Sequence, residues 1–216
     1  MVDKSNEYGY VPSSPTQARG SNTGVFEVND VTDLLLAEQW SGEFNALELI
    51  ETRTFTTQGT INFTTSTITD YNVHFFTFNH TLGGNSPALR VSSDGGSSWL
   101  ATNEYDYNYR DMERRTATGT EYRSTGLYFM PLGRSISIDQ GFGANVWIYN
   151  MNNANKYTHF TIQSTGTDTT DNINYYSQTL FGNGFVQDKA VHNALQLTTN
   201  TGTLSGTASL YGLKQV

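Results

Sequence analysis

Tyr105-Asp106-Tyr107-Asn108-Tyr109-Arg110 decides the fold class, because aromatic and polar side chains alternate strictly along it. A period of two is typical of a β-strand, whose successive side chains point to opposite faces. The three tyrosines therefore share one face of the predicted strand. Two interpretations stay open. Tyr105, Tyr107 and Tyr109 line a sandwich core or a subunit interface, or they form an exposed face that stacks on sugar rings.

Short segments rich in β-formers recur on both sides of this stretch, from Leu47 to Leu213. Turn residues separate them, and Asp94-Gly95-Gly96 is a strong turn signal. Many short strands at regular spacing predict an all-β fold, an antiparallel β-sandwich or jelly roll. The predicted strands cover 47–51, 54–63, 72–78, 88–92, 99–109, 127–132, 135–139, 145–149, 157–163, 172–180, 194–198 and 206–213.

The first 46 residues have a different character from the rest. Residues 1–24 are polar and contain Pro12 and Pro15, which indicates an extended arm. A short helix is predicted over 30–40, capped by Asn29 and ending at Trp40. We therefore divide the chain into an attachment segment, 1–46, and a sandwich domain, 47–216. Spaced apolar anchors in the segment are its predicted partner-binding residues: Tyr8, Tyr10, Val25, Phe26, Leu34 and Trp40.

The composition of the chain argues against several classes of function. The net charge is −8 and the pI about 4.8, which argues against nucleic acid and against an anionic membrane surface. The chain has no cysteine, which excludes disulfides and thiol chemistry. The first residues contain no secretory signal, and no apolar run reaches transmembrane length. The four histidines lack a metal-ligand spacing, so neither metal nor cofactor is expected.

The stretch from Ser92 to Trp99, with Asp94-Gly95-Gly96 at its centre, resembles the Asp-box turn of sialidases and related propellers. In that turn the aspartate accepts amide hydrogen bonds and the tryptophan packs beneath. The resemblance implies a hairpin tip with Trp99 anchored in the core. We expect positive φ at Gly95 or Gly96.

Charged residues are dense between Arg110 and Arg123, where a loop is predicted over 112–120. Glu113 and Glu121 are a conceivable carboxylate pair for glycoside hydrolysis, but nothing in the sequence fixes their separation. A loop of solvated or inter-subunit ion pairs is the better interpretation. Because the sequence has no nucleophile–base set, P-loop or dinucleotide motif, we predict that the protein is not an enzyme.

Three segments together resemble tailed-bacteriophage virion structural proteins. They are a lead-in, Ser21–Phe26 followed by Asn29–Val31 and a helix ending at Trp40; a central stretch, Arg90–Trp99; and a closing strand, Ser205–Lys214, that contains "LYGLK". The resemblance implies a jelly-roll component of a virion that is made in the host cytoplasm.

The implied role is capsid decoration or cement, or a head–tail or tail component. Its implied partners are major capsid or tail proteins. A homo-oligomer is expected, and a trimer is favoured because jelly-roll proteins in virions commonly form trimers. The alternative is a lectin-like receptor-binding module on a tail fibre or tip that recognises host surface glycans.

Overall fold

A computed structural model describes residues 17–18, 21–22, 47–82, 86–101, 103–113, 119–127, 130–133, 141–169, 175–200 and 202–213. The chain divides into two compact units, residues 1–46 together with Val216 and residues 47–215. In the first unit, the described part is a pair of short antiparallel strands, β1 (Gln17–Ala18) and β2 (Ser21–Asn22). The predicted helix over 30–40 lies outside the described residues.

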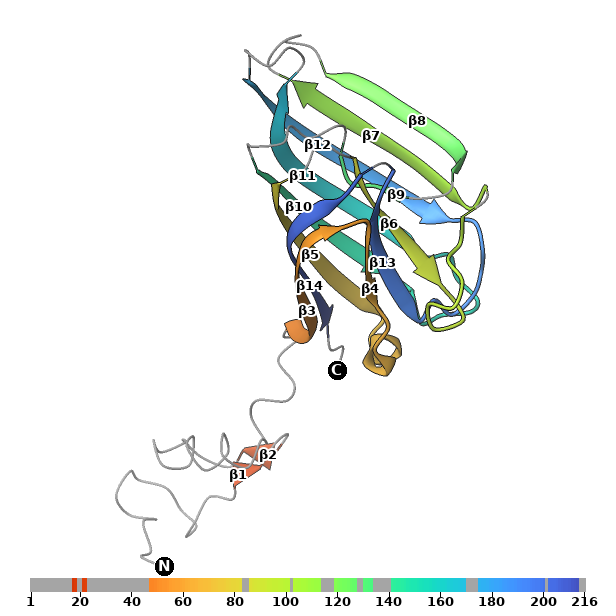
Figure 1. Ribbon diagram of the computed structural model, residues 1–216. Coiled ribbons are helices and arrows are strands. Elements are labelled where there is room, and N and C mark those ends of the chain that lie inside the picture. The colour runs from red at the N-terminus through yellow and green to blue at the C-terminus, as the bar shows by residue number, and fades with distance from the viewer. Residues whose placement is uncertain are drawn as a thin grey trace, which may run out of the picture. The chain divides into compact units, whose positions relative to one another are not determined.

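The second unit contains a large antiparallel sheet, eight-stranded in the described residues (Figure 1). In order across the sheet, the strands are β3 (Leu47–Gln58), β14 (Leu204–Leu213), β5 (Val73–Leu82), β10 (Phe142–Tyr149), β11 (His159–Thr169), β12 (Tyr175–Val186), β7 (Tyr105–Glu113) and β8 (Thr120–Leu127). Consecutive strands β10, β11 and β12 form a meander. The first and last of these eight strands along the chain, β3 and β14, pair with each other.

A smaller sheet, four-stranded in the described part of the chain, packs against the large one (Figure 1). Its order is β4 (Thr60–Phe63), β13 (Ala194–Thr199), β6 (Pro87–Ser92) and β9 (Met130–Pro131). The 3₁₀ turn η1 (Ser66–Asp70) follows β4 and buries Ile68. Among the described residues, no helix combines the length and apolar character that crossing a membrane requires.

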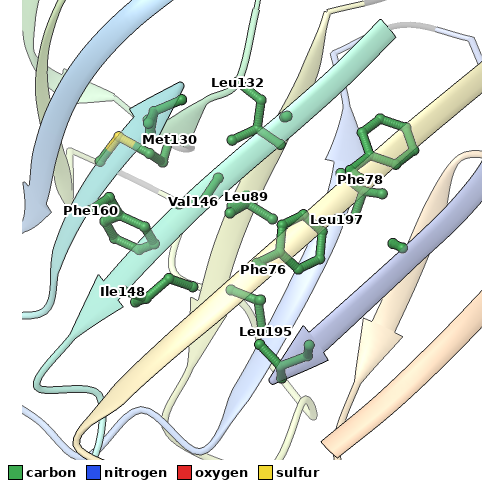
Figure 2. Close-up of a cluster of buried hydrophobic side chains, with 14 of the residues drawn as sticks. Phe76, Phe78, Leu89, Met130, Leu132, Val146, Ile148, Phe160, Leu195 and Leu197 are labelled. Carbon is green, nitrogen blue, oxygen red and sulfur yellow. The ribbon is translucent and has the colours of Figure 1, made fainter. Parts of the chain in front are cut away.

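The core lies between the two sheets (Figure 2). Phe76, Val146 and Phe160 project from the large sheet, and Leu89 and Leu197 face them from the small one; all five are at most 1% exposed. The alternation that places them there is plainest in β10, where every second residue from Phe142 to Ile148 is buried. Every described member of this core lies between Ile61 and Leu210.

The predicted all-β antiparallel sandwich is therefore confirmed. The jelly-roll variant stays a prediction. Four local predictions are wrong, and the strand predicted over 135–139 lies outside the described residues. The segments predicted as single strands over 54–63 and 127–132 each span the ends of two strands that belong to different sheets. The strand predicted to begin at Trp99 begins at Tyr105, because Asn103 just before it has a left-handed backbone with φ of 56°. The predicted loop over 112–120 is narrower, because Met112 and Glu113 still belong to β7 and Thr120 already belongs to β8.

Candidate functional site

The outer face of the large sheet turns away from the core and carries side chains of a distinct kind. In β5 the buried residues are His74, Phe76, Phe78 and His80, so Phe75, Thr77 and Asn79 point outward. In β10 the same alternation directs Gly143, Asn145, Trp147 and Tyr149 outward. Sheet register then aligns these outward residues with those of neighbouring strands into rows that cross the sheet.

One such row is aromatic. Phe75 is the register partner of Trp147 on one side and of Tyr211 on the other. The ring centroids of Phe75 and Trp147 are 4.6 Å apart, and those of Phe75 and Tyr211 are 6.2 Å apart. All three side chains are partly exposed. We call Tyr211, Phe75 and Trp147 the aromatic shelf. Beyond it, Leu49 on β3 pairs with Tyr211 and is 58% exposed.

The next two rows are polar. The first contains Ser209, Thr77, Asn145 and Gln163, and the second contains Thr207, Asn79, Gly143, Thr165 and Thr179. They line a shallow depression of about 470 Å³ that runs across β14, β5, β10, β11 and β12. We call this depression the polar trough.

Gly143 makes the trough hollow at its centre. A Cβ atom built on Gly143 would have no heavy atom within 4 Å, apart from its chain neighbours, so the missing side chain leaves open space. Glycine is unfavourable in a strand interior, where it often marks a site that a ligand approaches. Every described residue that lines the trough is uncharged.

Hydroxyl pairs hold the β3 side of the trough. Thr52 and Ser209 share a hydrogen bond of 2.8 Å, and Thr54 and Thr207 share one of 3.1 Å. Such cross-strand hydroxyl pairs stabilise a sheet and fix the positions of their side chains. The β3 side of the trough is therefore preorganised.

The tyrosines of β7 lie on the core-facing side of the large sheet. Tyr105 is fully buried, and Tyr107 and Tyr109 are partly buried and pack against the core. Tyr109 stacks on Tyr107 and on Tyr122 of β8, with centroids 5.4 and 4.9 Å apart. Of the two interpretations that the sequence left open, the structure supports the core. Tyr105 cannot belong to an exposed sugar-binding face, and Tyr107 and Tyr109 share its side of the sheet.

The hydroxyl of Tyr105 has a specific partner. The backbone N–H of Val91 donates to it over 2.9 Å, in the buried interior. Val91 lies on β6 beyond the two residues that pair with β9, so the tyrosine supplies an acceptor where the ladder has ended. Burial raises the pKa of Tyr105, which keeps the hydroxyl neutral.

The turn at Asp94 matches its predicted conformation, with φ of 72° at Gly95 and 87° at Gly96. The Asp94 carboxylate accepts hydrogen bonds from the Ser92 hydroxyl and from both the backbone N–H and the hydroxyl of Ser98. These bonds lower the pKa of Asp94 to about 2, with the Ser92 bond the largest cause and those from Ser98 next. The turn is thus held by hydrogen bonds among its own residues.

The predicted burial of Trp99 is wrong. Trp99 is only partly buried, and its ring lies beside Gly96, where an added Cβ would come within 3.2 Å of it. The turn is also not a hairpin tip between paired strands, because β6 pairs with β13 and β9. Trp99 follows the turn before any strand begins, so its ring covers the turn without entering the core.

Three of the four histidines are buried. His74 and His80 lie on the core face of β5, and His74 donates from Nε2 to the carbonyl of Ile68 over 2.8 Å. His192 shares a hydrogen bond of 2.7 Å between its Nδ1 and the hydroxyl of Thr158. Burial lowers the pKa of His74 and of His192. Among the described residues, no group of three His, Asp or Glu side chains could hold a metal ion.

The remaining predicted residues fall in two groups. Tyr8, Tyr10, Val25, Phe26, Leu34 and Trp40 lie outside the described residues. The described ends of the charged stretch lie on β7, up to Glu113, and on β8, from Thr120. There Glu121 is the register partner of Arg110, and Asn108 that of Arg123. Glu113 has Gln178 of β12 as its register partner.

Sequence reasoning missed the aromatic shelf and the polar trough. Two signals were present: the alternation from Gly143 to Tyr149, and the threonines of the closing strand. Their meaning depended on which face of each strand was buried and on which strands were neighbours. No known family model matches the chain, and no curated protein or solved structure matches it significantly.

Proposed function

We propose that the protein is a non-enzymatic structural component of a tailed-bacteriophage virion. It serves as a capsid decoration or cement protein, or as a head–tail or tail component. Its partners are neighbouring virion proteins, bound through residues 1–46, and it works as a homo-oligomer, most simply a trimer. The resemblance in the lead-in, central and closing segments supports the virion assignment.

One observation of the fold carries the attachment role. Every described member of the core comes from Ile61–Leu210, and the chain divides into units at residue 46. The described residues of the second unit thus build a core between their own two sheets. We assign the binding of a neighbour to residues 1–46, and the first residues of β3 that follow them, Leu47 and Leu49, are 42% and 58% exposed.

The test is truncation. A chain that begins at Glu43 is expected to keep the β-sheet circular dichroism spectrum and cooperative melting of the full protein. It is expected to be lost from purified particles that incorporate the full chain. As a matched control, the full chain with Gly59→Thr, an exposed substitution in the β3–β4 bend, should be incorporated normally. Equal incorporation of the truncated chain would place the attachment surface on the sandwich.

A second role, recognition of a host surface glycan, is favoured by the outer face of the large sheet. That face combines partly exposed aromatic rings with a hollow lined by hydroxyl and amide groups. A particle component with such a face can assemble through one unit and bind a receptor through the other. The two roles are compatible, and each can fail without the other.

A further inference from the structure

We infer that the polar trough and the aromatic shelf together bind a neutral oligosaccharide. This inference rests on the second proposed role, gives it a site and a ligand class, and does not depend on how the protein attaches to a particle. The site lies on the outer face of the large sheet, across β14, β5, β10, β11 and β12 (Figure 1).

The shelf supplies the apolar half of sugar recognition. A pyranose ring presents a patch of C–H groups on its face, and aromatic rings offer a flat surface of matching size. Phe75, Trp147 and Tyr211 form a continuous row, with neighbouring centroids 4.6 and 6.2 Å apart, and each is partly exposed. Trp147 also packs against Phe75, which limits the rotamer freedom that would be lost on binding.

The trough supplies the polar half. A sugar hydroxyl both donates and accepts hydrogen bonds, and threonine hydroxyls and Asn or Gln amides do the same. Thr77, Asn79, Asn145 and Gln163 point into the trough from three adjacent strands that hold their spacing. Rigid strands fix these groups better than loops would, so little ordering is needed when a ligand binds.

Charge decides between neutral and acidic ligands. No described residue that lines the trough is charged, so nothing in it would balance a sulfate, a phosphate or a sialic acid. The net charge of −8 also repels polyanions. A neutral glycan is the ligand that this surface can bind without an electrostatic cost.

A second copy of the chain is the main competing occupant, and the composition of the face argues against it. The buried centre of a protein interface is enriched in apolar groups, and a polar hollow would leave unfilled space there. The five strands span roughly 19 Å from β14 to β12, at about 4.8 Å between neighbours. That span suits a short oligosaccharide that lies across the strands.

Gly143 allows a test that fills the site without disturbing the fold. Thr at this position would extend into open space, its backbone is not in the left-handed region, and Thr favours strands more than Gly does. Gly143→Thr should therefore fold at least as well as the wild type. Gly59→Thr adds the same side chain at an exposed bend outside the trough and is its matched control.

The experiment uses the full chain and titration calorimetry. The neutral probes are short oligosaccharides of glucose, mannose, galactose and rhamnose, and the charged probes are sialyllactose and a sulfated galactan oligosaccharide. We expect a Kd of about 1 mM or tighter for at least one neutral probe. Gly143→Thr and Trp147→Ala should each weaken it at least tenfold, and Trp147→Phe should recover part of the loss. Gly59→Thr should bind as the wild type does.

A spectroscopic signature adds a second measurement. The chain has three tryptophans, and replacement of Trp40 and Trp99 by Phe leaves Trp147 as the sole reporter. Its emission should shift when the bound neutral probe is added, and the shift should disappear with Gly143→Thr. Size-exclusion chromatography of each variant follows the oligomeric state.

Four results would overturn the inference. The first is that the wild type binds none of the neutral probes, and the second is that Gly143→Thr binds as tightly as the wild type. The third is dissociation of an oligomer by Gly143→Thr or Trp147→Ala without any sugar binding, which would identify the face as a subunit interface. Tighter binding of the charged probes would equally refute the charge argument. Particle incorporation is measured separately, so loss of attachment cannot be mistaken for loss of sugar binding.

Discussion

Tyr105→Phe isolates the contribution of one buried hydroxyl to the sandwich. The substitution keeps the ring that fills the core and removes the acceptor of the Val91 N–H, which donates to it over 2.9 Å. Both Tyr105 and Val91 are fully buried, so water does not reach the orphaned N–H in the native packing. A buried donor left without an acceptor costs about 1–3 kcal/mol.

We therefore expect Tyr105→Phe to lower the free energy of unfolding by about 2 kcal/mol. For a domain of this size each kcal/mol corresponds to roughly 2–4 °C, so the melting temperature should fall by about 4–8 °C. Tyr105→Ala removes the ring as well and should cost about 3–5 kcal/mol for the lost packing alone. The difference between the two variants separates the hydroxyl from the ring.

The assay is urea denaturation followed by far-ultraviolet circular dichroism, with the slope of the transition compared between variants. Tyr107→Phe is the matched control: Tyr107 is two residues away on the same strand and only partly buried. It should change stability by less than about 0.5 kcal/mol. If Tyr105→Phe proved as mild as Tyr107→Phe, the Val91 N–H would have another acceptor and the argument would fail.

Three further predictions concern pH and the Asp94 turn. Burial lowers the pKa of His74 and of His192, so below about pH 6.5 the unfolded chain takes up protons before the folded chain does. The free energy of unfolding should therefore fall between about pH 7 and pH 5, and a flat profile in urea melts would contradict this. Hydrogen bonds lower the pKa of Asp94 to about 2, so the stability that its ionised carboxylate gives the fold is present above about pH 4 and is lost as the pH falls towards 2. Asp94→Asn should remove this loss of stability below about pH 4 and leave the rest of the acid unfolding unchanged. Trp99→Ala should cost less than the ~3–5 kcal/mol of a fully buried aromatic, and a loss in that range by thermal melting would show that Trp99 is a core residue after all.

The fold class could be predicted from the sequence because it depends on local alternation. The six residues from Tyr105 to Arg110 repeat with period two, and β10 does the same from Phe142 to Tyr149. Positive φ at Gly95 and Gly96 was equally local, since two glycines after an aspartate permit few other turns.

Burial and neighbourhood could not be predicted in this way. Alternation places Tyr105, Tyr107 and Tyr109 on one face but cannot say whether that face meets the core or solvent. Trp99 was expected inside because the resemblance of its turn to the Asp-box implied it, yet Trp99 is only partly buried. Both outcomes depend on the packing of the small sheet over the large one, which a period of two does not encode.

The candidate site shows the same dependence more sharply. Trp147 and Tyr211 are 64 positions apart in the sequence, and they become neighbours only because β5 lies between β10 and β14. The closing strand β14 is thus an interior strand of the sheet. It pairs with β3 on one side, where Leu213 is the register partner of Leu47, and with β5 on the other. Its side chains point alternately to the two faces of the sheet: Leu210 is buried in the core, and Tyr211 belongs to the aromatic shelf. Because one strand supplies residues to both, the core and the outer face depend on β14 together. A change that loosens β14 should therefore remove stability and sugar binding in the same step, whereas Gly143→Thr should remove only the second.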